Sequence, residues 1–373
     1  MNTLTRVVAL IAVAALVAAS CGSDENDEAG TAATTADVET TAAEPEATEP
    51  DDVVAGTKVT LVTHDSFALS EDVIAQFTAD TGIELKIVRG DDAGTVLNQS
   101  ILAAGNPLGD VIFGVDNNFM SRALDADILE PYDSPRLSAI PDEFELDPTN
   151  RLLPVDVGDV CLNYDVAWFA DNGIAPPTGL ADLVEPDYAD LTVVQNPATS
   201  SPGLAFLMAT IAEYGDGWTD YWRQLDDNGV AVSPGWSEAY YGDFTYAGGG
   251  DRPIVVSYAS SPPAEVFFAE PRPATAPTAV VEASCFRQQE FIGILAGTDN
   301  RAGAEALVDF MLSVEVQNDI PWNMFVFPVA DDATAPPEFV EFSLIPADPL
   351  SLPAADIEAN RDTWIQEWAE IIG

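Results

Sequence analysis

The sequence predicts an α/β fold built as two lobes. In residues 59–129, short apolar segments with strand character alternate with segments of helical character, and the same alternation returns in residues 191–258. Strands that alternate with helices favour a mostly parallel sheet covered by helices. Residues 57–373 are long enough for two domains of ordinary size, so each alternating region is expected to form its own lobe.

The first region opens with an expected strand at 59–63. The first expected helix begins after Ser70, whose side chain can cap it, and ends at Gly82, which can adopt the left-handed conformation. The other elements expected in this region are a strand at 83–87, a helix at 95–104, a strand at 110–115 and a helix at 117–129.

The second region and the C-terminal part continue the alternation. Proline-rich residues 262–277 are expected to form an irregular surface excursion. The last segment carries Trp364 and Trp368 at helical spacing, which predicts a packed helix rather than a site. The expected elements are strands at 191–194, 254–258 and 291–295, and helices at 202–214, 300–310 and 354–372.

The N-terminus predicts export from the cytoplasm. Residues 1–20 carry Arg6, an apolar run too short to span a bilayer, and small residues before Cys21. Small residues directly before a cysteine resemble the cleavage site of bacterial lipoproteins, in which the cysteine becomes the lipid-modified N-terminus. Cys21 is therefore an expected lipid anchor, and residues 1–20 are an expected signal peptide. The alternative is a secreted protein with a chance cysteine at this position.

Residues 21–56 are expected to form a disordered acidic tether. From residue 22 onwards this stretch has no aromatic residue, Lys or Arg, so it cannot bury enough apolar surface to offset the entropy of ordering. The whole chain has 13 basic against 63 acidic residues, a formal net charge of −50. This charge excludes nucleic acid as a partner and favours cationic solutes. A surface adapted to a salty habitat explains many of the charges equally well.

Seven sequence blocks occur in an order that points to a known family. They include Thr-His-Asp-Ser-Phe at 63–67, Gly-Val-Asp-Asn-Asn at 114–118, residues 195–204, Gly-Trp-Ser-Glu-Ala-Tyr at 235–240, and residues 257–262, 320–329 and 364–368. The ordered set resembles the thiamine-binding periplasmic proteins of ABC importers. The resemblance implies an extracytoplasmic substrate-binding component that delivers its ligand to permease and ATPase subunits.

The resemblance also implies the type II periplasmic-binding-protein fold, in which the chain crosses twice between the lobes. The first lobe is then expected to contain residues 57–157 and 286–373, and the second residues 158–285. Outside the cytoplasm, the even pair Cys161 and Cys285 is a disulfide candidate. The implied hinge places both cysteines beside it, where we expect them to be bonded. Two separate buried thiols are the alternative.

The family resemblance supplies a set of expected ligand contacts. Asp65 follows a strand end and Asp92 lies in an acidic-glycine turn, so both are expected near a cation, with helix capping as the alternative role. Ser200 precedes a helix whose free amides could hold a hydroxyl or phosphate group. Trp236 and Tyr258 are the expected stacking surfaces, although a core role is the alternative for a lone Trp.

Three positions depart from the family pattern. The family commonly has Tyr at the position of His64, Tyr at that of Ala264 and Trp near Phe325, so at least one stacking surface is expected to be smaller. His64 and Phe325 remain expected ligand contacts, and Trp322 or Phe119 could compensate. Losing one cation–π contact costs about 0.5–2 kcal/mol. The expected ligand is therefore thiamine, thiamine phosphate or a close cationic analogue.

Two binding alternatives and one catalytic alternative remain. The neighbouring Tyr240 and Tyr241 are compatible with ferric-ion binding on the same fold, and a polyamine or other organic cation is a further candidate. Residues 64–66 contain the residue types of a hydrolase triad, but adjacent side chains on an extended segment point to opposite faces. The single His also gives no zinc pattern. We expect no enzyme, metal or cofactor, and a monomer on the outer face of the cytoplasmic membrane.

Overall fold

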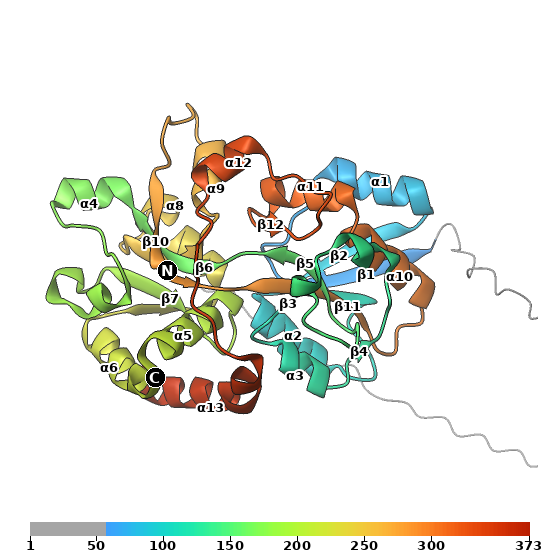
Figure 1. Ribbon diagram of the computed structural model, residues 1–373, viewed down its shortest axis with the longest axis horizontal. Coiled ribbons are helices and arrows are strands. Elements are labelled where there is room, and N and C mark those ends of the chain that lie inside the picture. Colours follow the sequence, from blue (N-terminus) through green and yellow to red (C-terminus); the bar gives the residue numbers. More distant parts are fainter. Residues whose placement is uncertain (1–56) are drawn as a thin grey trace, which may run out of the picture. The chain divides into compact units, whose positions relative to one another are not determined.

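The computed structural model describes residues 57–373, whose strands form two separate sheets (Figure 1). The expected signal peptide, the lipid anchor at Cys21 and the tether at 21–56 lie outside the described residues. One sheet has seven strands in the order β12-β5-β11-β3-β1-β2, with β4 paired to β11, and the other has five in the order β10-β6-β9-β7-β8. We call the regions around these sheets the first and the second lobe. The predicted two-lobed α/β fold is confirmed.

The first lobe combines elements from both ends of the described chain. They are β1 (Lys58–Thr63), α1 (Glu71–Thr81), β2 (Glu84–Arg89), α2 (Ala93–Leu102), β3 (Val111–Asp116), α3 (Met120–Asp125), β4 (Leu129–Glu130), β5 (Leu153–Val157), β11 (Gln289–Leu295), α10 (Arg301–Met311), α11 (Val314–Asn323) and β12 (Phe327–Pro328). Ser70 caps α1 by accepting from the backbone N–H of Val73, and Gly82 ends it with a φ of 71°, as predicted.

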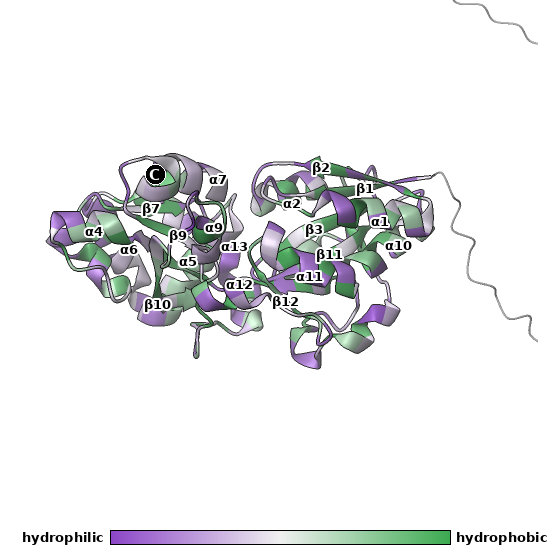
Figure 2. Cartoon of the chain, turned by 90° about the horizontal axis from the view of Figure 1, so that it is seen from above, coloured by the Kyte–Doolittle hydropathy of each residue, from purple (hydrophilic) through white to green (hydrophobic). Residues whose placement is uncertain are grey.

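The second lobe is built from the middle of the chain. It contains β6 (Val160–Asp165), α4 (Val166–Asn172), β7 (Thr192–Gln195), α5 (Ser201–Tyr214), α6 (Trp218–Asp227), β8 (Ala231–Ser233), α7 (Trp236–Glu238), a π-helical turn (Ala239–Asp243), α8 (Thr245–Gly248), β9 (Ile254–Tyr258), α9 (Pro262–Phe267) and β10 (Thr278–Phe286). In both lobes the apolar strands lie inside: Figure 2 shows β3, β7 and β9 in the hydrophobic colour, and their apolar side chains are buried.

Three sequence expectations need correction. Both sheets are mixed rather than mostly parallel, because β5, β6 and the long pair β10 and β11 run antiparallel to their neighbours. The helix expected at 117–129 is limited to α3, since Leu129 and Glu130 form the short strand β4 on β11. The proline-rich segment 262–277 is not irregular throughout, because its first six residues form α9.

The chain crosses between the sheets through two adjacent connections. Strand β5 is followed by β6 after residues 158–159, and β10 by β11 after residues 287–288. Cys161 and Cys285 lie beside these crossings, on the side of the second sheet, and are joined by a disulfide bond. The two lobes are thus connected by short segments at which a hinge motion can take place.

The last two helices are α12 (Pro337–Phe342) and α13 (Ala354–Ile372), and α13 departs from the expected assignment of residues 286–373 to the first lobe. Figure 1 shows α13 beneath α6, and Trp368 packs edge-to-face on Trp222 of α6 at 5.7 Å. In the N-terminal half of the helix, Arg361 donates to the carbonyl of Asn118 in the first lobe. The apolar side of α13 packs against α6 of the second lobe, and Arg361 contacts the first lobe. The helix therefore contacts both lobes.

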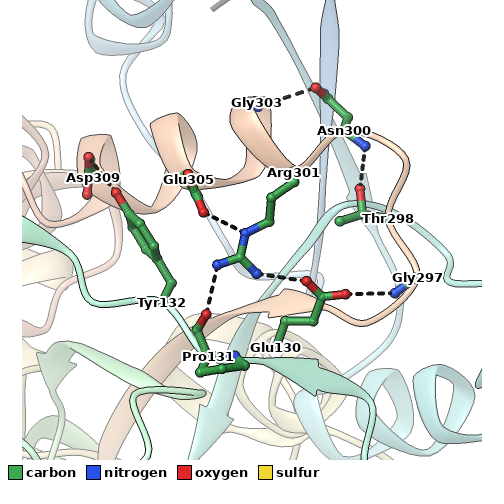
Figure 3. A network of polar contacts seen from close by, with 10 residues as sticks. All are labelled: Glu130, Pro131, Tyr132, Gly297, Thr298, Asn300, Arg301, Gly303, Glu305 and Asp309. Carbon is green, nitrogen blue, oxygen red and sulfur yellow. Dashed lines mark hydrogen bonds and ion pairs between the residues drawn. The ribbon is translucent and has the colours of Figure 1, made fainter. Parts of the chain in front are cut away.

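A polar network fixes β4 to α10 at the far end of the first lobe (Figure 3). The guanidinium group of Arg301 contacts Glu305 at 2.6 Å, Glu130 at 2.8 Å and the carbonyl of Pro131 at 2.7 Å. Beside it, Tyr132 donates to Asp309 at 2.9 Å.

Within residues 57–373, no helix has both the length and the apolar content needed to cross a membrane.

Candidate functional site

A cavity of about 310 Å³ lies between the two lobes. The first lobe contributes polar and apolar lining side chains, among them His64, Asp65, Ser66, Glu290 and Phe325. The second lobe contributes mainly aromatic side chains, among them Trp236, Tyr240, Tyr241, Tyr258 and Phe268. The structure therefore brings five of the expected ligand contacts into one cavity: His64, Asp65, Trp236, Tyr258 and Phe325.

The aromatic wall is centred on Trp236, at the start of α7. Its ring stacks on Tyr240 at 4.9 Å and 18°, while Tyr241 meets it edge-on at 5.4 Å. The indole N–H donates to Ser257 Oγ at 2.9 Å, which fixes the ring beside β9. Tyr258, the last residue of β9, lies 6.2 Å away at a tilt of 54°. This wall offers two differently oriented aromatic faces to a flat ligand.

Next to the cavity, aromatic side chains from both lobes are in contact with one another. Phe267 of α9 stacks on Trp322 of α11 at 4.7 Å, and Phe268 lies 5.6 Å from Phe325. Phe325 follows α11 with a φ of 56°, a left-handed conformation that is uncommon for a bulky residue. Neither Trp322 nor Phe119 is part of the cavity lining, so they do not replace the family's missing aromatic surfaces at this position.

Two expected contacts, Asp92 and Ser200, lie behind the cavity wall. Asp92 caps α2 and accepts hydrogen bonds from the backbone N–H groups of Ser201 at 3.1 Å and Trp236 at 2.9 Å. Ser200 caps α5 by accepting from the N–H of Gly203. The carboxylate of Asp92 thus occupies the amide of Ser201, one of the groups at the start of α5 that were expected to hold a hydroxyl or phosphate group of a ligand.

These contacts dock α2 of the first lobe on the second lobe. The N–H of Thr95 donates to the carbonyl of Thr199 at 3.0 Å. Gly94 permits this approach, since a Cβ atom there would lie 2.7 Å from the same carbonyl oxygen. Burial raises the pKa of Asp92 to about 6, so its carboxylate is ionised at neutral pH and accepts from both lobes. The lobes are therefore held in a closed arrangement around the cavity.

Sequence reasoning missed Glu290, a carboxyl group on the cavity wall that is 6% exposed. It follows two buried glutamines and directly precedes the apolar residues of β11, and this charged residue beside an apolar strand segment was the available signal. Directly opposite on β5 lies Asp156, which is fully buried. Asp65, by contrast, is an exposed residue at the mouth of the cavity.

His64 does not supply a positive charge to this site. Its Nε2 atom lies 3.8 Å from Glu290 Oε1 and has no hydrogen-bond partner, while Nδ1 and Ser66 Oγ are 2.9 Å apart. Burial lowers the pKa of His64 to about 4, so the ring is neutral at physiological pH. Asp65 makes no hydrogen bond to His64, so residues 64–66 lack the acid–base contact that a hydrolase triad requires.

Comparison with known proteins gives consistent matches along the chain. Residues 106–341 match the family of bacterial extracellular solute-binding proteins. The thiamine-binding periplasmic protein of Salmonella typhimurium is 30% identical over 322 residues, covering 84% of this chain and 93% of the relative. The corresponding protein of Brucella melitensis is 28% identical over 327 residues, covering 83% and 91%.

Solved structures agree with this assignment of the fold. A periplasmic thiamin binding protein is similar with a TM-score of 0.74 at 29% identity, over 86% of this chain and 99% of its own. Iron-bound HitA from Pseudomonas aeruginosa has a TM-score of 0.66 at 18% identity, over 84% of this chain and 99% of its own. The second likeness concerns the fold alone.

Proposed function

Because the chain belongs to the bacterial extracellular solute-binding proteins, we propose that it is the substrate-binding component of an ABC importer and captures thiamine or a close cationic analogue. The proposal rests on the kinds of side chain that line the cavity. The cavity places Trp236 and Tyr258 on one side and the carboxyl groups of Asp65 and Glu290 on the other, and its lining, drawn from residues 57–373, includes no Lys or Arg.

The chemistry of thiamine matches this arrangement. The molecule joins an aminopyrimidine ring to a permanently cationic thiazolium ring, so a receptor needs stacking faces, an electron-rich surface and an acidic group. Trp236 and Tyr258 supply faces that attract a cation, each worth about 0.5–2 kcal/mol. The relatives named for thiamine binding cover most of the chain and support the same ligand. With His64 and Ala264 at positions where the family has larger aromatic residues, the stacking faces come mainly from Trp236 and Tyr258.

Among the candidate forms we favour unphosphorylated thiamine. A phosphate ester needs cationic side chains or free backbone amides. The amide of Ser201 at the start of α5 already donates to Asp92, and the cavity lining carries acidic rather than basic side chains. An additional negative charge beside Glu290 is therefore unfavourable inside the cavity, although a phosphate that projects through the mouth would avoid it.

Ferric iron fits the site less well than an organic cation. Iron-binding tyrosines must lose their hydroxyl protons, but burial and the neighbouring Glu265 raise the pKa of Tyr240 well above its usual value. Its hydroxyl group donates to Glu265 at 2.7 Å. A polyamine has no ring to use the stacked faces of Trp236, so it is the weaker organic candidate.

The remaining parts of the proposal concern the surroundings of the protein. We propose that it is a monomer without enzymatic activity, held on the outer face of the cytoplasmic membrane by a lipid on Cys21. Closure of the lobes on the ligand would create the surface recognised by the permease. No cofactor is required, since the function is binding and delivery.

Isothermal titration of the purified, ligand-stripped protein tests this proposal. Thiamine, thiamine phosphate, the isolated hydroxymethylpyrimidine, spermidine and ferric citrate are compared under one set of conditions. We expect tight binding of thiamine, weaker binding of the pyrimidine alone and no binding of the iron complex. Tight binding of spermidine or iron together with no heat for thiamine would refute the proposed ligand.

A further inference from the structure

Two acidic side chains face each other at the inner wall of the cavity. Asp156 of β5 and Glu290 of β11 are direct partners in the antiparallel pair, so their side chains leave the sheet on the same face. Asp156 is fully buried and Glu290 is 6% exposed, and Glu290 reaches the cavity lining. Two buried carboxyl groups directly opposite each other on neighbouring strands cannot both be ionised without a large cost in free energy.

No neighbouring residue compensates this charge. The titratable groups that face Glu290 from the surrounding elements are Asp156 on β5, Asp116 on β3, Asp92 at the start of α2, His64 after β1 and Tyr258 at the end of β9. Three of these are acids, and His64 is neutral at physiological pH. Within the described residues, Glu290 therefore has no fixed cationic partner.

The surroundings of Asp156 indicate that the carboxyl pair is protonated. No N–H or O–H group of residues 57–373 is a hydrogen-bond partner of either carboxylate oxygen of Asp156. A buried acceptor without a donor is costly, so the donor available to it is a proton carried by Glu290 itself. Burial raises the pKa of Asp156 to about 8, and burial with the facing Asp156 raises the pKa of Glu290 well above its usual value. Both carboxyl groups are therefore protonated at neutral pH, and the pair is uncharged in the empty cavity.

We infer that Glu290 is the group that recognises the positive charge of the ligand, and that one of the two protons held by Glu290 and Asp156 leaves the protein when the ligand enters. The inference rests on the proposed capture of a cationic ligand in this cavity. A thiazolium ring beside Glu290 supplies the positive charge that the site lacks. Loss of one proton to the solvent leaves the pair with a single negative charge, which balances the single positive charge of the thiazolium ring.

The sign of the pH dependence follows from this exchange. Before binding, the carboxyl pair has raised pKa values, and the cation lowers them by favouring the ionised form. Binding therefore releases a proton and becomes tighter as the pH rises towards about 8. Above this pH the pair in the free protein has already lost one of its two protons, so the affinity levels off. Because the two groups titrate together, the release belongs to the pair.

Calorimetry of the wild-type protein measures the proton directly. Thiamine is titrated at one pH near neutrality into the protein in several buffers that differ in their enthalpy of ionisation. The slope of the observed heat against the buffer enthalpy gives the number of protons exchanged. We expect the release of about one proton per thiamine at neutral pH and a smaller release above about pH 8.

Variants then assign the proton to the carboxyl pair. Glu290→Gln is expected to weaken thiamine binding at least ~30-fold and to abolish the proton release. Asp156→Asn is expected to reduce the release and to cost less affinity, because removal of the facing acid lowers the pKa of Glu290 while its carboxyl group remains. Asp65→Asn, at the exposed mouth, should reduce affinity but keep the proton release. Glu143→Gln, an exposed residue of the first lobe, is the matched control.

The possible outcomes are distinguishable. Thiamine binding with proton release that disappears in Glu290→Gln supports the inference. Thiamine binding by the wild-type protein without proton release overturns it and leaves the proposed function intact, and this result does not depend on whether any variant folds. No heat with thiamine for the wild-type protein overturns the proposed ligand and the inference together.

Discussion

Replacement of Asp92 by Asn tests how the closed arrangement of the lobes is held. The change keeps the size of the side chain and one acceptor oxygen. Oδ1 can still accept from Ala93 and Ser201, but an amide group replaces Oδ2 and meets the N–H of Trp236, which now lies 2.9 Å from that oxygen. One hydrogen bond to a charged acceptor is lost, and two donors face each other.

The expected size of the effect follows from that contact. A hydrogen bond to a charged group is worth about 1.5–3 kcal/mol. Since about 1.4 kcal/mol corresponds to a tenfold change, thiamine affinity should fall by about 10- to 150-fold. Calorimetry of the purified protein gives the dissociation constant, and thermal unfolding of the same sample shows whether the variant is folded.

The neighbouring Asp91 provides a matched control, because Asp91→Asn removes the same charge from an exposed position. Its thiamine affinity should stay close to that of the wild-type protein. Gly94→Ala, which brings a Cβ atom to within 2.7 Å of the Thr199 carbonyl oxygen, should weaken binding by the same route as Asp92→Asn. Equal affinities for Asp92→Asn, Asp91→Asn and the wild-type protein would refute the role of this interlobe contact.

Three further changes probe the stacking wall and the scaffold. Trp236→Ala removes the central ring and should weaken thiamine binding at least ~10-fold in calorimetry, and unchanged affinity would show that the ligand does not stack there. The double change Cys161→Ser and Cys285→Ser opens a disulfide that links residues 124 positions apart, and denaturant unfolding should show a loss of about 2–5 kcal/mol. Arg301→Ala should lower the free energy of unfolding by about 1 kcal/mol. The control Arg223→Ala removes an exposed ion pair and should change the free energy of unfolding by less than about 0.5 kcal/mol. Equal changes in the two variants would contradict the role given to the network in Figure 3.

Local signals in the sequence were sufficient for many helices and strands. The helix α1 could be predicted because Ser70 and Gly82 act through neighbouring backbone atoms. The end of α3 could not, because residues 129–130 pair with a strand that lies more than 150 positions further along the chain. The antiparallel strands β5, β6 and β10 at the hinge were equally hidden, since their polar residues resemble those of loops and their partners are distant in sequence.

The candidate site was predictable where side chains follow strand ends or lie in family blocks, as for Asp65, Trp236 and Tyr258. Asp92 and Ser200 were placed on the ligand because a carboxylate and a helix start both suit a polar ligand. In the structure both groups lie at the interlobe contact, where Asp92 accepts from the N–H of Ser201 at the start of α5 and Ser200 caps α5 itself. The position of Glu290 depends on strand register across the hinge, which composition and periodicity do not contain.

A crystal structure of the protein with thiamine is the most direct test of the central claim, that a cationic ligand is captured between the two lobes. The account predicts the thiazolium ring within about 6 Å of the Trp236 ring centre and beside the carboxylate of Glu290, with both lobes in contact with the ligand. A ligand bound to one lobe only, or one whose thiazolium ring lies away from both Trp236 and Glu290, would contradict it.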